Sequence, residues 1–286
     1  MQQREKIGEV NIDWMQAAFG KGKKRRKTVG FGKYDRKEKK FEVEVYVREL
    51  SIIDAGIGSG VWDASIIFAR WIFENKDFFK GFFSSFLFFC FNFHEFVLEK
   101  DKVVIELGAG CGLPGILCAR FAKQVFLTDY MEQLVENLEY NVKLNSNVEE
   151  EGEGEEKEMR GRVLERCKVL ELDWEKEEKY PPFDVLPKAD IVIGSELTYS
   201  DLNIQSLVRV VERYLHPSGV FYEVLSDDRD GVVEFLKRME ERGWRVEKRK
   251  VGERFYGNFN TKQRQETYHF YSFYPPRSTS TYPLMN

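Results

Sequence analysis

The stretch that decides the fold is VIELGAGCGLPG, residues 104–115. The apolar run Val103–Leu107 leads directly into its glycines, which is typical of a buried parallel strand that ends in a ligand-binding loop. Leu113–Ala122 follows with Pro114 in its first turn, and this pattern predicts a helix. Glycine lets backbone approach a ligand closely, and a helix N-terminus adds positive potential. The geometry suits either a dinucleotide pyrophosphate or the aminoacyl end of S-adenosylmethionine.

The next predicted strand ends in an acidic residue. Gln124–Thr128 is followed at once by Asp129, and Met131–Leu144 then has the pattern of a helix. An acid in this position can accept two hydrogen bonds from ribose hydroxyls. The alternative is that Asp129 only caps the following helix. Together the loop and the acid predict a cofactor that contains a nucleoside, and they do not choose which one.

Strand-like and helix-like segments continue to alternate along the rest of the chain. The expected strands are Cys167–Leu172, Asp190–Ser195 and Gly219–Leu225, and the expected helices are Leu202–Leu215 and Gly231–Arg242. Trp244–Val251 and Thr267–Tyr274 are rich in β-formers, which favours an antiparallel hairpin at the sheet edge. The pattern predicts an α/β fold with a Rossmann-like, doubly wound sheet.

The N-terminal part is expected to differ from this domain. Phe41–Val47 alternates apolar and charged residues, as a half-exposed strand does, and Val61–Phe73 is expected to be a helix packed near the sheet. Residues 21–40 hold eleven Lys or Arg against two acids. We therefore expect a flexible basic arm over 1–40 and one folded domain over 41–286. The arm suits a nuclear-import signal, a dock for an acidic partner, a nonspecific RNA contact or a solvated tail.

Two segments look like insertions into the domain. The first, 74–97, belongs to a stretch with eleven phenylalanines between Phe73 and Phe96. It is too short and too interrupted to span a bilayer, so it predicts a packed insertion, a partner or membrane-surface patch, or a segment foreign to the mature protein. The second, 149–162, is rich in Glu and Gly and is expected to be a disordered surface loop.

The cysteine and histidine content bears on the cellular compartment of the protein and on whether it binds a metal. The four cysteines show no framework spacing and no signal peptide is evident at the N-terminus, so a reducing compartment, the cytosol or the nucleus, is expected. The three histidines are far apart and form no ligand pattern with the cysteines. No metal site is expected.

Five motifs occur in a characteristic order. They are GVWDA at 60–64, ELGAGCGLPG at 106–115, LTD at 127–129, DW at 173–174 and SELTY at 195–199. On these motifs, residues 41–274 resemble the seven-β-strand (class I) protein-lysine methyltransferases. The resemblance implies a seven-stranded sheet whose last strand is antiparallel. It also implies S-adenosylmethionine as cofactor and a protein side chain, most often lysine, as substrate.

The resemblance also implies roles for individual residues. The cofactor-binding set would be Trp62, Glu106, Gly108, Ala109, Gly110, Asp129, Trp174 and Ser195. In this set Gly108 to Gly110 would line the methionine moiety, with Glu106 reaching its amino group through water. Asp129 would hold the ribose and Trp174 would lie near the adenine. Trp62 would contact the cofactor from the N-terminal helix, and Ser195 would meet it at the end of the fourth strand. The alternative for both tryptophans is an ordinary place in the core.

Glu196 and Tyr199 form an acid-x-x-Tyr unit directly after a predicted strand, at the sheet edge where ligands bind in such folds. The resemblance implies that this unit positions the target nitrogen, with Glu196 bound to the incoming amine and Tyr199 orienting it. The alternative for Glu196 is a loop acid near a helix start. Related protein-histidine methyltransferases also have Glu in place of the commoner Asp, so histidine remains a second candidate target.

The expected function is therefore an N-methyltransferase acting on a protein side chain, with lysine first. A small-molecule N-methyltransferase is a variant of the same activity. Two further classes stay open, an NAD(P)-dependent oxidoreductase and a non-catalytic binding module. The oxidoreductase lacks a visible second substrate domain, and the intact cofactor motifs disfavour the binding module. Nucleic acid is a conceivable partner only through the basic arm.

Overall fold

A computed structural model describes residues 22, 24–76, 102–146, 155–198, 203–256 and 267–276, with 155–160 as backbone only. Tyr199 and most of the Phe-rich segment 74–97 lie outside these ranges, so the expectations for them are not tested. Within these ranges no helix combines the length and the apolar character needed to cross a membrane.

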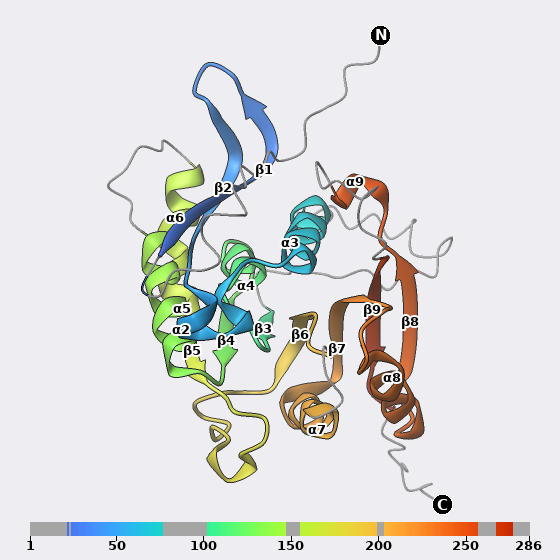
Figure 1. Cartoon of the computed structure of the whole chain (residues 1–286). Coiled ribbons are helices and arrows are strands. Elements are labelled where there is room, and N and C mark those ends of the chain that lie inside the picture. Colours follow the sequence, from blue (N-terminus) through green and yellow to red (C-terminus); the bar gives the residue numbers. More distant parts are fainter. Residues whose placement is uncertain are drawn as a thin grey trace, which may run out of the picture.

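A seven-stranded sheet forms the middle of the protein (Figure 1). Its strands are β3 (Val103–Glu106), β4 (Gln124–Asp129), β5 (Cys167–Glu171), β6 (Ala189–Ser195), β7 (Leu215–Ser226), β8 (Arg245–Lys250) and β9 (Tyr268–Tyr274). The spatial order is β5-β4-β3-β6-β7-β9-β8. Strands β3 to β7 are parallel, and β9 runs antiparallel to both β7 and β8. The expected Rossmann-like sheet with a final antiparallel strand is confirmed.

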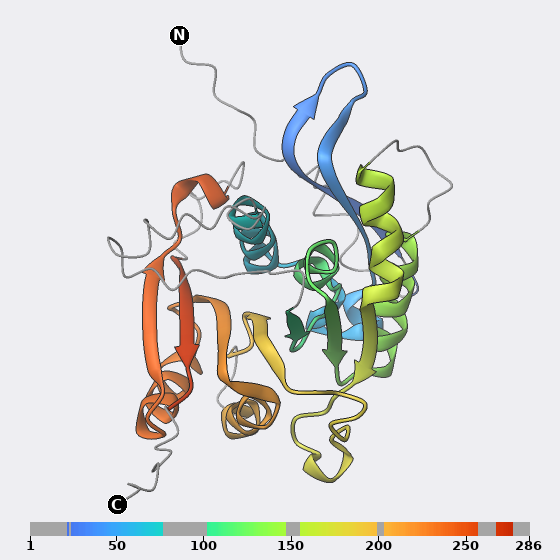
Figure 2. The same ribbon diagram turned by 180° about the vertical axis from the view of Figure 1, so that it is seen from behind.

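Helices cover both faces of the sheet, as the two opposite views show (Figures 1 and 2). One core contains side chains of α3 (Asp63–Asn75), α4 (Leu113–Cys118) and α5 (Glu132–Leu144), and the other contains those of α7 (Ile204–Tyr214) and α8 (Val232–Glu241). Because the parallel strands are covered on both sides, they are apolar along most of their length. The shorter elements are α2 (Ile52–Ala55), η1 (Ile57–Ser59), η3 (Glu177–Lys179) and α9 (Glu253–Tyr256).

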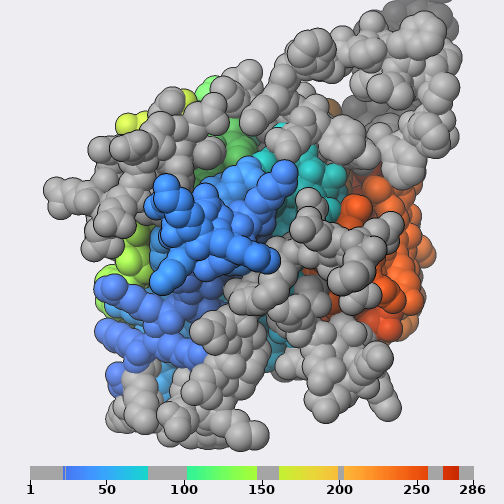
Figure 3. Space-filling model, turned by 90° about the horizontal axis from the view of Figure 1, so that it is seen from above, coloured from blue at the N-terminus to red at the C-terminus, as the bar shows by residue number. Residues whose placement is uncertain are grey.

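Strands β1 (Arg25–Asp35) and β2 (Lys40–Glu49) form a separate antiparallel hairpin beside α3 (Figure 3). This corrects the expectation of a flexible arm that extends to residue 40. Val29 and Phe31 of β1 are buried in the core, and the ring of Phe31 lies 5.7 Å from that of Phe73. The basic residues hid the short apolar alternation of β1, which becomes a strand because α3 covers its apolar face.

Helix α6 (Glu155–Arg166) corrects a second expectation, because it occupies part of the acidic segment 149–162 that was expected to be disordered. Its Glu, Lys, Arg and Met residues are good helix formers. Val163 near its end is fully buried in the core under α5 and β5. Among the described residues of the helix, Val163 and Arg166, which donates a hydrogen bond to the Ala122 carbonyl, link it to the domain, and the composition of the charged run gives no sign of either contact.

Three buried asparagines join α5 to the free edge of β2. Asn137, Asn141 and Asn145 are spaced by four residues, so they lie on one face of the helix. The Asn141 Oδ1 accepts a hydrogen bond from the Arg48 N–H at 2.7 Å. The Asn145 side chain accepts from the Tyr46 N–H at 2.9 Å and donates to the Tyr46 carbonyl at 2.6 Å. These side chains satisfy backbone groups that a third strand would otherwise pair.

Replacing Asn145 with Ala should therefore destabilise the fold by about 2 kcal/mol or more, because both backbone groups of Tyr46 lose their partner inside the protein. Urea unfolding measures the change in the free energy of unfolding. Lys143→Ala, on the exposed side of the same helix, is the matched control and should change it by less than about 0.5 kcal/mol. Equal losses in the two variants would show that the asparagine contacts do not matter.

Candidate active site

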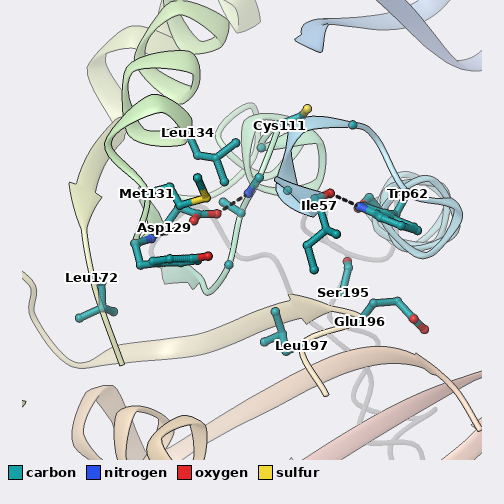
Figure 4. Close-up of a pocket in the computed structure, with 18 of the residues that line it drawn as sticks. Ile57, Trp62, Cys111, Asp129, Met131, Leu134, Leu172, Ser195, Glu196 and Leu197 are labelled. Carbon is teal, nitrogen blue, oxygen red and sulfur yellow. Dashed lines mark hydrogen bonds between the residues drawn. The ribbon is translucent and has the colours of Figure 1, made fainter. Parts of the chain in front are cut away.

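A cavity of about 500 Å³ opens at the carboxyl edge of the parallel strands. It lies beside β3, where the strand order reverses between β4 and β6, the position at which open α/β sheets bind ligands. Figure 4 shows Asp129 and Leu172 at one end of the cavity and Trp62, Ser195 and Glu196 towards the other. Residues that are distant in the sequence therefore meet, as the motif order predicted.

The glycine loop between β3 and α4 forms one wall of the cavity, with Gly108, Ala109 and Gly110 among the lining residues. Gly108 and Gly110 both have a φ of 54°, in the left-handed region that favours glycine. A Cβ on Gly110 would lie 2.8 Å from the backbone oxygen of Gly58, too close for any other residue. The loop therefore presents bare backbone to the cavity for a steric reason.

Asp129 ties this loop to the end of β4. Its Oδ2 accepts a hydrogen bond from the Gly110 N–H at 2.9 Å, and its Oδ1 accepts one from the Tyr130 N–H at 2.8 Å. Burial raises the pKa of Asp129, and the backbone N–H groups of Gly110, Tyr130 and Met131 oppose that rise. The result is a rigid, lining carboxyl group with oxygens directed by the backbone, which suits an acceptor for ligand hydroxyls.

Glu106 is not among the residues that line the cavity, and its expected contact with a cofactor amino group through water stays a prediction. Its carboxyl group is 3% exposed and accepts a hydrogen bond from the Gly115 N–H at 2.9 Å. Burial raises the pKa of Glu106 to about 8, and the charge of Asp129 adds to the effect of burial. Glu106 therefore supports the start of α4 from behind the loop, because its strand position points it inward.

Both tryptophans of the motifs line the cavity. Trp62 is the N-cap residue of α3, is 46% exposed, and donates from Nε1 to the Ile57 carbonyl at 2.8 Å. It is therefore not an ordinary core aromatic. Trp174 lies next to Gly108, and its backbone carbonyl accepts a hydrogen bond from the Tyr180 hydroxyl at 2.5 Å. One hydrogen bond therefore fixes the Trp62 indole, and another fixes the backbone of Trp174.

Ser195 and Glu196 extend the cavity beyond the end of β6. The Ser195 hydroxyl oxygen is buried and has no hydrogen-bond partner within the described part of the chain. The Glu196 carboxylate turns away from Asp129 in Figure 4. It accepts a hydrogen bond from the Ser226 N–H at 2.6 Å and forms an ion pair with Arg229. Glu196, the acidic residue of the acid-x-x-Tyr unit, is therefore already bound by Ser226 and Arg229 of the same chain.

The sequence analysis missed several lining residues, and among the described ones Arg229 is the only cation. Arg229 follows the end of β7 by three residues, and its side chain is 29% exposed. The sequence could have indicated Arg229, because residues just after one parallel strand lie at the same carboxyl edge of the sheet as residues just after its neighbours. Within the described ranges no group of three His, Cys, Asp or Glu residues could hold a metal ion.

Strand order and site together define the class of protein. A dinucleotide-binding sheet has six parallel strands, whereas here β9 is inserted antiparallel between β7 and β8. This arrangement, with a glycine loop after β3 and an acid at the end of β4, is that of the class I methyltransferases. The chain belongs to the lysine methyltransferase family, whose sequence pattern matches residues 44–242.

Curated relatives in this class differ in the residue that their names give as the target. METTL23 of Xenopus laevis, a histone-arginine methyltransferase, is 26% identical, covering 72% of this chain and 76% of its own. EFM7 of Cryptococcus neoformans var. neoformans, a protein N-terminal and lysine N-methyltransferase, is 34% identical, covering 43% and 38%. A histidine protein methyltransferase 1 homolog of Dictyostelium discoideum is 25% identical, covering 64% and 48%. The chain spans about a third to three quarters of the length of such relatives.

The buried carboxyl group of Glu106 predicts a pH-dependent stability. Its pKa rises from the ordinary glutamate value of 4.5 to about 8 in the folded protein, so the folded state keeps a proton that the unfolded state releases. Stability is therefore lost as the pH rises from about 4.5 to about 8. Glu106→Gln, which keeps an oxygen for the Gly115 N–H, should remove this loss. At pH 8.5 it should gain on the order of 3 kcal/mol over wild type, relative to their difference at pH 5.

Urea unfolding at the two pH values tests this expectation. Glu136→Gln, on the exposed face of α5, is the control and should change the free energy of unfolding only slightly, and by the same amount at both pH values. A difference between wild type and Glu106→Gln that is the same at pH 5 and pH 8.5 would refute the assignment of a raised pKa to Glu106.

Proposed function

We propose that the protein is an S-adenosylmethionine-dependent N-methyltransferase that modifies a protein side chain, with lysine as the first candidate. The observation that carries the proposal is the meeting of three elements in one cavity. The glycine loop after β3, Asp129 at the end of β4 and Glu196 after β6 all lie at the same sheet edge. Family membership supports methyl transfer over hydride transfer.

The lining residues fit the proposed cofactor. The backbone of Gly108 to Gly110 would bind the amino-acid part, together with the buried hydroxyl of Ser195, which has no partner among the described residues. Asp129 would accept hydrogen bonds from the ribose hydroxyls, and Trp174 would pack near the adenine. S-adenosylmethionine supplies a methyl group on positively charged sulfur, and the acceptor nitrogen takes this methyl as the carbon–sulfur bond breaks.

The chain's own residues must hold the acceptor nitrogen neutral and in line. A lysine amine has a reference pKa near 10.4, so at neutral pH freeing its lone pair costs roughly 4 kcal/mol. Glu196 would accept a hydrogen bond from an N–H of the amine and so direct its lone pair into the cavity. A carboxylate has about four acceptor positions, so this bond is compatible with those from Ser226 and Arg229. No histidine is among the described lining residues, so water is the proposed final proton acceptor.

The choice of acceptor rests on the relatives and on Glu196. EFM7 is named for lysine and N-terminal methylation, and the family description also names lysine. Histidine is the second candidate, because Glu at this position and a relative named for histidine both favour it. The proposal of a cytosolic or nuclear location, and of an acidic or nucleic-acid partner for the basic N-terminus, stays a prediction.

Asp129→Ala should weaken binding of S-adenosylhomocysteine by about 100-fold. The change removes two charge-assisted hydrogen bonds to the ribose and releases the Gly110 N–H as well. Isothermal titration calorimetry measures the affinity. Asp190→Ala, at the amino end of β6 and far from the cavity lining, is the control and should leave the affinity unchanged. Near-normal affinity in Asp129→Ala would contradict the ribose assignment.

Transfer itself is tested by incubating the full chain with methyl-labelled S-adenosylmethionine and cell lysate, then locating the label by mass spectrometry. We expect label on a lysine of one or a few proteins. Glu196→Gln should lower transfer about 100-fold while affinity for S-adenosylhomocysteine changes less than threefold. Glu212→Gln, on the outer side of α7, is the control for folding and should behave as wild type.

The position of the label decides between the candidates. Label on histidine would select the second acceptor, and label only on small molecules would move the substrate outside proteins. Absence of any transfer by a chain that binds the cofactor would overturn the proposed activity.

A further inference from the structure

The ion pair between Glu196 and Arg229 lies in the wall of the candidate active site, and most of each side chain is covered by the rest of the protein. The Glu196 side chain is 9% exposed and that of Arg229 is 29% exposed. Both residues line the cavity. They come from two neighbouring strand ends, since Glu196 follows β6 and Arg229 follows β7. A partly buried pair such as this is screened less by water than a pair on the open surface.

The backbone at Glu196 is strained in a way that fixes this pair. Its φ is 58°, in the left-handed region, which is unfavourable for a residue other than glycine. Three hydrogen bonds to β7 oppose that cost. The Glu196 N–H donates to the Val224 carbonyl at 3.0 Å, and the Leu197 N–H donates to the buried Glu223 carboxyl at 3.0 Å. The Ser226 N–H donates to the Glu196 carboxylate.

We propose that Arg229 is a positioning residue that holds the Glu196 carboxylate in the acceptor end of the cavity and offsets its charge there, so that this end receives a neutral nitrogen rather than a cation. The inference rests on the proposed function. Its physical reason is that an unpaired carboxylate would stabilise the ammonium form of an incoming amine, which has no lone pair to offer. The paired carboxylate still accepts a hydrogen bond but attracts a cation less strongly.

Among the residues that the structure describes, other charged groups near this pair do not replace Arg229. Burial raises the pKa of Glu223 to about 8, so this neighbour is mostly protonated and adds little charge at neutral pH. Asp227 is engaged by Lys248 at 2.7 Å and lies 3.1 Å from His269 on β9. Asp228 accepts a hydrogen bond from the Ser226 hydroxyl. The remaining charged residues in the described lining are Asp129, Asp173 and Glu175, all acidic.

Two cofactor analogues test the charge at the acceptor end without a known substrate. Sinefungin carries an amino group, protonated at neutral pH, where the cofactor carries its methyl, and S-adenosylhomocysteine carries nothing there. The ratio of their dissociation constants, measured by calorimetry on the full chain, therefore reports how strongly that end attracts a cation. Arg229→Gln should shift the ratio about tenfold in favour of sinefungin, because Glu196 loses its partner.

Three further variants make the test specific. Arg229→Lys keeps the charge and should retain most of the wild-type ratio. Glu196→Gln should shift the ratio the opposite way, several-fold against sinefungin, because the carboxylate charge at position 196 then no longer offsets the positive charge of Arg229. The double variant Glu196→Gln with Arg229→Gln should return near wild type. Arg238→Gln is the control, because Arg238 pairs with Glu234 on α8 at 2.7 Å and does not line the cavity.

The outcomes separate this inference from the proposed function. Failure of the wild-type chain to bind either analogue would refute the proposed cofactor. Binding of both analogues, with the ratio unchanged within twofold in Arg229→Gln and in Glu196→Gln, would refute the role of the pair. If Arg229→Gln does not fold, as judged by its thermal transition, Glu196→Gln alone decides, since its predicted shift has the opposite sign.

Discussion

The hydrogen bond from the Gly110 N–H to the Asp129 carboxylate is the contact on which the cavity depends. It joins the glycine loop after β3 to the end of β4, so two strand ends share one rigid edge. The positive φ of Gly110 aims its N–H at that carboxylate, and the nearby Gly58 backbone leaves no room for a side chain. The conformation of the glycine loop, its close packing on Gly58 and the position of the Asp129 carboxylate therefore depend on one another.

The two ends of the cavity are built by different means. The end near Asp129 consists of backbone and of residues at the ends of hydrogen-bonded strands, which suits an invariant ligand. The end near Glu196 depends on a side-chain ion pair and on one strained backbone position. Side chains of this kind can be exchanged without disturbing the sheet.

The parts that could be predicted were those with a local signal. The apolar run before Gly108, the acid at the end of β4 and the alternation of strands and helices were all visible, and they locate the end of the cavity near Asp129. Strand β2 was expected from the alternation over Phe41–Val47, but β1 and helix α6 were missed, because their charged residues outweigh a few apolar ones in any local count. Val163 and Phe31 stabilise these elements only through residues that are distant in the sequence.

By itself, the sequence determined the class of sheet, the glycine loop after β3 and Asp129 at the end of the neighbouring strand β4. These features depend on hydrophobic periodicity and on glycine positions, which are visible within a few consecutive residues. Only the tertiary structure decided that Glu106 supports the loop from behind instead of facing the cavity. It also decided that Arg229 meets Glu196. Both outcomes depend on the direction of a side chain relative to another strand, and that direction follows from the packing of the whole sheet rather than from neighbouring residues.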